Sequence, residues 1–576
     1  MSARQPSVDE TLISQLLPLV PEPQRQELEA LLTPGLASPA SREAVLQNVC
    51  EHIDWDSQRE HLGMLLNFLL PLEQLVPEVY HEWRPIIRAA VAFLGTHLSL
   101  HRLLPKLISQ LSLPADCPLE HRLVPLLAQM PTLQKLGQVI ARNPRLDAVV
   151  RTELTRLENS IADFPPPAGQ REVEQQLAEQ IAEYAIDLAN TYLAEASVSV
   201  VIPFTWTDPG TGKRTAGVFK VLKPYIPAYL AEELRLLDEF TQFLARSEQQ
   251  SVLSHAHVQE VFADIRHLIE QEINFPQEQA NLQAAAARYA SVGGVHIPRL
   301  LPTLSTDTIT ATAYEPGVKV TAAFPGTAWK QRQLARDLTA ALLLVPLFAP
   351  DENVVFHADP HAGNLLCDEN SGTLILLDWA LTVQLSRLQR RYLLLLTAAL
   401  GLRDEELICQ GIATLSLDDF THEPTQAARV RQHVARFLHA LSPFTLPGIV
   451  QTVTLLDQLA LTGVRFPAAL VIFRKVLFTL EGVVHDIAPE MQFDTAFGQA
   501  LLSPGISYFW RPARVGFLPG SLLSLDDWLL LQRSALCSGY RLWQQLGKYL
   551  AGVWARSRQG EIHDMPTADG RFPIPG

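Results

Sequence analysis

The segment at residues 357–364 constrains the fold of this chain more than any other feature of its sequence. It reads His-Ala-Asp-Pro-His-Ala-Gly-Asn, and a further aspartate, Asp378, follows fourteen residues after Asn364. Two apolar runs, 365–367 and 373–377, flank the residues Asp-Glu-Asn-Ser-Gly, a pattern typical of two strands joined by a tight turn. The sequence therefore predicts a hairpin that brings Asn364 and Asp378 to the same end.

Oxygen-bearing side chains at this spacing are typical of a phosphotransfer site. Kinase-type enzymes place an aspartate on a catalytic loop, an asparagine five residues later and a second aspartate beyond a short hairpin. The Asn364 amide oxygen and the Asp378 carboxylate suit Mg²⁺, while Asp359 would orient or deprotonate the acceptor. A metallohydrolase that uses His357, Asp359 and His361 is an alternative, but its other ligands would have to come from unmarked positions.

A lysine upstream supports the phosphotransfer interpretation. Residues 217–222 read Gly-Val-Phe-Lys-Val-Leu, an alternating strand in which Lys220 would contact the α and β phosphates of a nucleotide. Lys223 is the weaker candidate, and an exposed strand lysine without a role is the simple alternative. The segment Asp-Pro-Gly-Thr-Gly-Lys-Arg at 208–214 lacks the glycine spacing and the Ser or Thr of a phosphate-binding loop, so it predicts a β-hairpin turn.

Together these motifs resemble the UbiB/AarF family of atypical protein-kinase-like proteins over residues 125–490. The family's Lys-x-Gly-Gln signature is matched by Lys-Leu-Gly-Gln at 135–138, and its His-x-Asp-Pro-His-x-Gly-Asn loop by 357–364. Residues 194–201 resemble the Ala-rich loop that replaces a glycine-rich phosphate loop. The family occurs in bacteria, mitochondria and plastids and is linked to ubiquinone and other isoprenoid lipids.

The resemblance implies nucleotide-binding roles for residues of the strand, the Ala-rich loop and a Tyr-Glu-Pro-Gly hinge. Lys220 would hold the phosphates of ATP or ADP, and Glu278 would pair with Lys220. Asn364 and Asp378 would hold Mg²⁺. The remaining positions expected to contact the nucleotide are Ala196, Ser197, Tyr314 and Glu315.

The same resemblance implies that the Lys-x-Gly-Gln helix gates the nucleotide site and obstructs the place where a protein substrate would lie. Glu272 would meet Lys135, and Gln138, three residues on, would share a helical face with Lys135. Pro276 suits the first turn of a new helix, which places Glu278 near its N-terminus and Glu272 at the end of the preceding element. Taken alone, the 135–138 stretch could be an ordinary amphipathic helix.

Several positions depart from the family pattern. Asn274 replaces a second acid, so it brings no charge to a metal or a lysine. Ala380 replaces the glycine of Asp-Phe-Gly and removes its backbone freedom. Val200 stands at a polar position of the Ala-rich loop, so the phosphates would rely more on backbone N–H groups. Ala362 replaces a second proline, which is a mild change.

Composition bounds the class of protein. The 576 residues, 47% of them hydrophobic, can fill several cores. A net charge of −15 argues against nucleic acid and against general attraction to anionic membranes, although a local basic patch could exist. The five cysteines show no metal spacing, which favours reduced thiols. Without a signal-peptide pattern or a long uncharged apolar run, we expect a cytoplasmic protein that could bind a membrane peripherally and has no transmembrane helix.

The order of elements predicts an α+β, two-lobed protein-kinase-like fold with a large all-helical N-terminal extension and a helical C-terminal tail. The apolar and aromatic stripe in the tail would pack within the molecule, or lie on a membrane or another protein. The expected divisions are an extension at 1–125, the gating element at 126–167, a small mixed lobe at 168–318, a mainly helical lobe at 319–490 and the tail at 491–576.

We therefore expect a kinase-like protein that binds ATP and Mg²⁺ and hydrolyses ATP or transfers its γ-phosphate, in service of isoprenoid quinone or lipid metabolism. Two other classes stay open: a pseudokinase scaffold or lipid-handling chaperone switched by nucleotide, and a small-molecule phosphotransferase. The 135–138 element disfavours the last, because it would crowd a substrate cleft. Candidate partners are an isoprenoid lipid, a membrane surface and, through the N-terminal helices, another protein.

Overall fold

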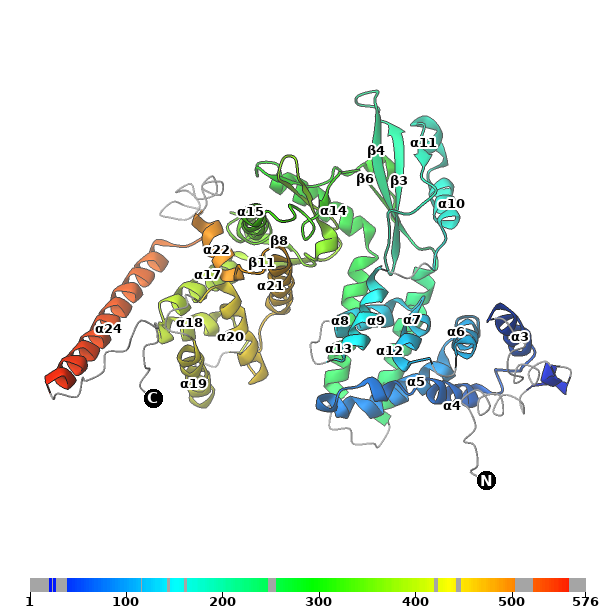
Figure 1. Cartoon of the computed structure of the whole chain (residues 1–576), viewed down its shortest axis with the longest axis horizontal. Coiled ribbons are helices and arrows are strands. Elements are labelled where there is room, and N and C mark those ends of the chain that lie inside the picture. Colours follow the sequence, from blue (N-terminus) through cyan, green and yellow to red (C-terminus); the bar gives the residue numbers. More distant parts are fainter. Residues whose placement is uncertain are drawn as a thin grey trace. The chain divides into compact units, whose positions relative to one another are not determined.

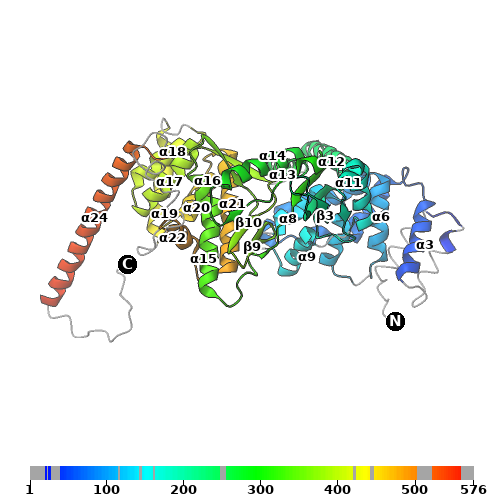
Figure 2. The same cartoon turned by 90° about the horizontal axis from the view of Figure 1, so that it is seen from above.

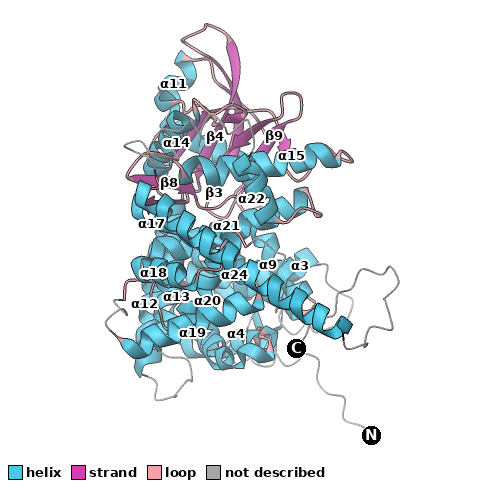
Figure 3. Cartoon of the chain, turned by 90° about the vertical axis from the view of Figure 1, so that its left-hand side faces the viewer, coloured by secondary structure: helices cyan, strands magenta, loops and turns pink. Residues whose placement is uncertain are grey.

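The structure is a computed structural model. Two compact units divide the chain: the first comprises 1–284 and 298–314, and the second comprises 285–297 and 315–576 (Figure 1). Helices make up most of each unit and strands form small sheets (Figure 3), so the predicted α+β class is confirmed. The residues that the structure describes are 20–22, 24–26, 39–114, 117–141, 146–159, 163–246, 255–418, 423–441, 447–502 and 522–558.

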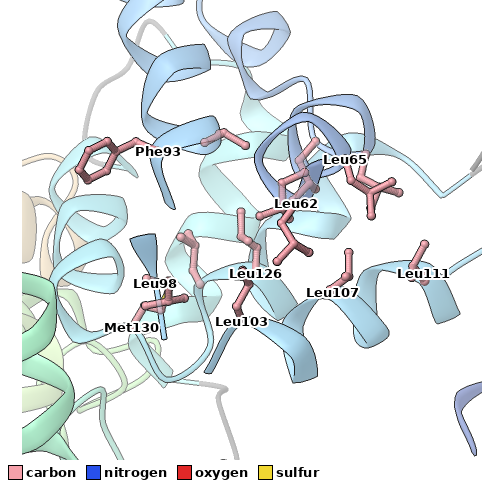
Figure 4. Close-up of a cluster of buried hydrophobic side chains, with 14 of the residues drawn as sticks. Leu62, Leu65, Phe93, Leu98, Leu103, Leu107, Leu111, Leu126 and Met130 are labelled. Atoms are coloured by element: carbon pink, nitrogen blue, oxygen red, sulfur yellow. The ribbon is translucent and has the colours of Figure 1, made fainter. Parts of the chain in front are cut away.

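The N-terminal helices of the first unit enclose a leucine-rich core (Figure 4). Leu62, Leu66 and Leu103 are fully buried in it. Helices α4 and α5 approach closely at Gly63, which has no side chain. A Cβ added there would lie 2.8 Å from the Ala92 carbonyl oxygen. The helices of this region are α3 (Pro39–Glu51), α4 (Arg59–Leu69), α5 (Arg84–His97), α6 (Leu100–Ser112) and α7 (Leu123–Leu127), with short 3-10 turns at Leu72–Leu75, Glu78–Trp83 and Leu119–Arg122.

A buried arginine joins these helices to α12 (Ile226–Arg246). Arg102 lies 2.9 Å from a Glu232 carboxylate oxygen, also pairs with Glu233, and stacks 4.0 Å from the centre of the Tyr229 ring. Leu236 and Phe240 of α12 belong to the same apolar core. The N-terminal helices are therefore part of the first unit's packing.

The sheet of the first unit has the order β1-β3-β4-β6, with β2 also paired to β3. The neighbouring strands are antiparallel. The predicted turn between β3 and β4 is confirmed, because Asp208 N donates to Lys213 O at 2.9 Å and Gly212 has a φ of +66°. The strands are β1 (Asp187–Leu188), β2 (Ala194–Glu195), β3 (Ser199–Thr207), β4 (Arg214–Leu222) and β6 (Ile309–Ala313).

One expectation for this sheet is wrong. Val200 lies within β3, opposite Val221 of β4, and is fully buried in the sheet's core. It is therefore a core residue of a strand and not part of a phosphate-contacting loop. Strand alternation turns its side chain inward, so a polar residue there would lack water.

Six further helices flank the sheet or lead into the second unit. Helix α8 packs against α9, α12 and α13, and α10 packs against β3 and β4. Their bounds are α8 (Pro131–Ala141), α9 (Ala148–Asn159), α10 (Pro166–Gln176), α11 (Ala178–Glu183), α13 (His255–Glu272) and α14 (Phe275–Tyr289).

In the second unit, small sheets and a group of helices surround the 357–364 loop. The sheets have the orders β5-β10-β9-β7 and β11-β8. The strands are β5 (Val295–His296), β7 (Val318–Lys319), β8 (Asn353–His357), β9 (Leu365–Asp368), β10 (Thr373–Leu376) and β11 (Thr382–Ser386). The helices are α15 (Ala328–Thr339), η6 (Ala340–Leu344), α16 (Val345–Leu347), α17 (Arg387–Gly401), α18 (Glu405–Leu415), α19 (Pro424–Ala440), α20 (Ile449–Leu461), α21 (Ala468–Ile487), α22 (Phe493–Leu502) and α24 (Leu525–Arg558).

The apolar segment 340–347 forms η6 and α16, which are buried throughout. No helix in the described part of the chain is both long enough and apolar enough to cross a membrane. The cysteines differ in exposure: Cys50 of α3 and Cys367 of β9 are buried, whereas Cys537 of α24 is exposed.

A glycine before α20 allows a close contact that supports a testable prediction. Val450 N donates to Asp494 Oδ1 at 3.2 Å, and a Cβ added at Gly448 would overlap that carboxylate. Gly448→Ala is expected to lower the free energy of unfolding by about 1–3 kcal/mol, measured by urea unfolding. In α21, Gly482→Ala is the control, because no atom lies within 4 Å of its added Cβ and alanine favours helix. Equal effects of the two substitutions would contradict the steric argument.

Candidate functional site

The first unit brings Lys220 and Glu278 together. Lys220 lies on β4, where it is paired with Val201 of β3 and Thr310 of β6. Its Nζ lies 2.7 Å from Glu278 Oε1 of α14, and the glutamate is 4% exposed. Burial of one partner strengthens the attraction and fixes the lysine's direction. The sheet and the start of α14 therefore hold the lysine in place.

The start of α14 is set by a cap. Asn274 Oδ1 accepts a hydrogen bond from Gln277 N at 3.1 Å, which is the contact of a helix N-cap. Pro276 is the second residue of α14, and α13 ends at Glu272, so the helix break predicted at this proline is confirmed. Asn and Asp cap equally well, hence Asn274 keeps the helix start while contributing no charge.

A second ion pair joins α8 to α13. Lys135 Nζ donates to Glu272 Oε1, and Lys135 is 6% exposed. Gln138 is half-buried on the same helix. The structure thus brings together the two residues that the family resemblance pairs, on helices that pack directly against each other.

Lys223, the weaker candidate, is committed to a different cluster. Its side chain is fully buried, 2.5 Å from Asp163 Oδ1 and 2.9 Å from Glu195 Oε1. Tyr225 donates its hydroxyl to Asp163 Oδ2 at 2.9 Å. This cluster ties the segment before α10 to the sheet, so Lys223 serves the fold.

The residues expected to contact the nucleotide lie in a turn of the first unit and at a boundary between the units along the sequence. Ala196 and Ser197 form the turn between β2 and β3, where Ala196 N donates to Ser199 O at 2.8 Å. Tyr314 ends the first unit, and its N–H donates to Ala216 O at 3.1 Å. Glu315 begins the second segment of the second unit, with its carboxylate 2.8 Å from His296 Nε2. Contacts of these residues with a nucleotide stay predictions.

In the second unit, a buried histidine organises the 357–364 loop. His357 ends β8, and its Nδ1 accepts from Asp359 N at 3.2 Å while its Nε2 lies 2.9 Å from Leu377 O. Because Nδ1 accepts, Nε2 carries the proton and donates to Leu377. The ring also lies edge-to-face with Trp379, 5.0 Å between centres. His357 therefore connects the loop to both residues that flank Asp378.

The predicted hairpin is confirmed. Leu365 of β9 is paired with Leu376 of β10, and Leu377 N donates to Asn364 O at 2.9 Å. The turn uses Gly372 at a φ of +72°. At the other end of the hairpin, a short 3-10 turn, η7 (Ala362–Asn364), leads into β9. The Asn364 side chain donates through Nδ2 to Asp359 O at 3.2 Å.

Asp378 has a left-handed backbone. Its φ is +50°, and its Oδ1 accepts from Ala380 N at 3.1 Å. Aspartate and asparagine tolerate this conformation better than most residues. The described backbone angles place no positive φ at Ala380, so the alanine found in place of glycine carries no left-handed strain.

The donor set of this loop fits magnesium. The Asn364 nitrogen donates within the loop, so its amide oxygen is the atom it can offer to a cation, beside the carboxylate of Asp378. Hard oxygen donors of this kind suit Mg²⁺. Within the described ranges, no group of three or more His, Cys, Asp and Glu side chains is arranged to hold a metal. The metallohydrolase alternative gains no support.

The neutral state of His357 predicts a pH dependence of stability. Burial lowers the pKa of His357 below its ordinary value. The stability that neutral His357 contributes is therefore fully present above the pKa of the unfolded state, about 6.5. It is lost as the pH falls from that value to the lower pKa of the folded state. His357→Gln should reduce the decline in melting temperature between about pH 7 and pH 5.5. His361→Gln, at a half-exposed ring, should keep the parent's slope; equal slopes for all three proteins would contradict the assignment.

This chain is similar in sequence to known proteins. A model of the ABC1 atypical kinase-like domain matches residues 156–411. A Shewanella woodyi protein named "Probable protein kinase UbiB" is 28% identical over 375 residues, covering 63% of this chain and 65% of the relative. An Arabidopsis thaliana protein named "Protein ACTIVITY OF BC1 COMPLEX KINASE 7, chloroplastic" is 25% identical over 374 residues, covering 63% of this chain and 51% of the relative. The match thus spans about half the length of the Arabidopsis relative and about two thirds of the Shewanella relative.

A solved Mycobacterium tuberculosis structure, a complex of Rv3197 with erythromycin, also aligns with this chain. The identity is 15%, the TM-score is 0.36, and the alignment covers 55% of this chain and 82% of the other. This likeness is too low to support an argument about function.

Proposed function

From the ABC1 atypical kinase-like domain that this chain contains, we propose that it binds ATP or ADP with Mg²⁺ and slowly hydrolyses ATP or transfers its γ-phosphate. The observation that carries the proposal is the ion pair between Lys220 on β4 and the buried Glu278 on α14. A strand lysine held by a helix glutamate is the arrangement that protein kinases require to hold nucleotide phosphates.

The second unit would supply the remaining groups. Asn364 and Asp378 would hold Mg²⁺, which when bound neutralises charge on the phosphates. Asp359 would hold the proton of a water molecule or an acceptor hydroxyl. His357, by its hydrogen bonds to Asp359 N and Leu377 O, would keep the loop and the Asp378 segment in fixed register.

The first unit would also restrict access to the nucleotide site. We propose that Lys135 and Gln138 gate the nucleotide site, with Glu272 as the fixed partner of Lys135. A helix tied in this way would leave little room for a protein substrate, which favours ATP hydrolysis. The link to isoprenoid quinone or lipid metabolism rests on the family names alone and is proposed on that basis.

Asp378→Asn tests the proposal, because asparagine tolerates the left-handed backbone of this position and removes only the charge. Purified parent and variant would be compared for thermal shift with Mg-ATP and for phosphate release. In the parent we expect a magnesium-dependent thermal shift and phosphate release. In the variant, the affinity for Mg-ATP derived from the thermal shift and the rate of phosphate release should each fall at least about tenfold. Equal nucleotide binding by the two proteins would overturn the site. A shift without release in the parent would favour the pseudokinase class.

A further inference from the structure

Helix α24 buries two polar side chains and exposes several large apolar ones. A surface helix normally buries its apolar side chains and exposes its polar ones. In α24 the side chains of Asp527 and Ser534 are buried, at 2% and 3% exposure. Several large apolar side chains are exposed, and Figures 1 and 2 show α24 as one long helix.

The polar face of α24 docks on its own unit. Arg391 of α17 binds the Asp527 carboxylate with two hydrogen bonds, of 2.7 and 2.8 Å. Asp527 also accepts from Ser524 N at 2.7 Å and donates its own N–H to Ser524 Oγ, which caps the helix start. Farther along, Ser538 Oγ donates to Leu402 O at 2.5 Å. These contacts fix which face of α24 points outward.

The outward face carries a stripe of large apolar side chains. At about 100° per residue, its members fall within an arc of about 60°, roughly opposite Asp527, Ser534 and Ser538. The stripe consists of Leu525, Leu529, Leu536, Tyr540 and Trp543, exposed by 53%, 54%, 76%, 61% and 71%. Exposed apolar surface of this kind marks an interaction site.

The charge of α24 indicates which partner it fits. The whole chain has a net charge of −15, yet residues 528–558 contain five basic residues and no acidic one. Arg533 is exposed beside the stripe. Anionic lipid head groups attract such residues, and Tyr and Trp favour the boundary between water and hydrocarbon. A second copy of α24 would instead place like charges side by side.

We propose that the Leu525–Trp543 stripe of α24 lies on the surface of an anionic lipid membrane, with its apolar side chains in the head-group boundary and Arg533 at the lipid phosphates. The proposal is independent of nucleotide chemistry, because none of these residues belongs to the Lys220 or Asp378 sites. It also gives a role to the positive charge of residues 528–558 in a chain whose net charge is −15.

The test is co-sedimentation of the full chain with vesicles of phosphatidylcholine alone or mixed with phosphatidylglycerol. We expect binding to the mixed vesicles, weakened at least about tenfold by Leu536→Glu with Trp543→Glu. Leu530→Glu is the matched control: Leu530 is on the same helix and 41% exposed, but lies about 100° around from Leu529. It should change binding by no more than about twofold.

A second variant tests the charge. Arg533→Glu should weaken binding to mixed vesicles several-fold, and added salt should do the same. Circular dichroism and melting temperature would verify folding of each variant. Equal binding to neutral vesicles, no binding to either kind, or binding unchanged in the stripe variant would overturn the proposal. Self-association of the parent that is lost in the stripe variant would show that a second copy covers the stripe.

Discussion

Replacing Asp359 with asparagine is expected to lower phosphate release from Mg-ATP at least about 100-fold, because a positioned acid or base contributes that much to proton transfer. Nucleotide affinity should change little. The hydrogen bonds that hold the loop use the backbone N–H and carbonyl of this residue, to His357 and from Asn364, so the substitution leaves them in place. Phosphate release and nucleotide-induced thermal shift measured on one preparation would separate rate from binding.

Asp368→Asn is the matched control for this prediction. Asp368 lies at the other end of the same hairpin, where its carboxylate accepts from Asn370 N at 3.1 Å and from Ser371 Oγ at 2.6 Å. These hydrogen bonds lower the pKa of Asp368, as expected for a turn-stabilising carboxylate. We expect a small change in stability and none in rate. Comparable loss of activity in both variants would show that the hairpin's integrity, and not Asp359 itself, controls the reaction.

The largest effect on stability is expected at Lys223. Its removal in Lys223→Met leaves the partly buried Asp163 and Glu195 without this cation, and breaking a buried ion pair costs about 3–5 kcal/mol. Urea unfolding of the variant should show this loss. Lys213→Met, in the exposed β3–β4 turn, is the control and should change stability by less than about 0.5 kcal/mol.

A further variant separates lost charge from lost packing. Neutralising both acids, as Asp163→Asn with Glu195→Gln in the Lys223→Met background, should recover part of the stability because no unpaired charge then remains buried. No recovery would mean that the methylene stem of the lysine, or the hydrogen bond from Tyr225, accounts for the loss.

The sequence predicted features whose signals are local. The hairpin between Asn364 and Asp378 follows from two short apolar runs and a glycine turn, and the start of α14 follows from Pro276. The cap by Asn274 also has a local signal, an asparagine three residues before the donor N–H of Gln277, which the family comparison obscured by presenting that position as a missing acid.

Two contacts between distant residues, Lys220 with Glu278 and Lys135 with Glu272, were expected only from the family resemblance. Other features that depend on distant partners were not predicted. The Lys223 cluster joins residues 60 positions apart in the chain, and no short pattern marks such a contact. Val200 was misplaced because only the register with Val221 shows which strand residues point into the core. The left-handed backbone of Asp378 likewise has no signal in the spacing of the sequence.

The exposure of Cys537 gives this chain a built-in labelling position. Burial raises the pKa of Cys50 to about 12 and those of Cys367 and Cys409 to about 11, and the thiolate is the reactive form. A maleimide dye at neutral pH should therefore modify Cys537 ahead of these three. With Cys117 replaced by serine, one fluorophore on α24 would report the polarity of its surroundings in the otherwise intact protein.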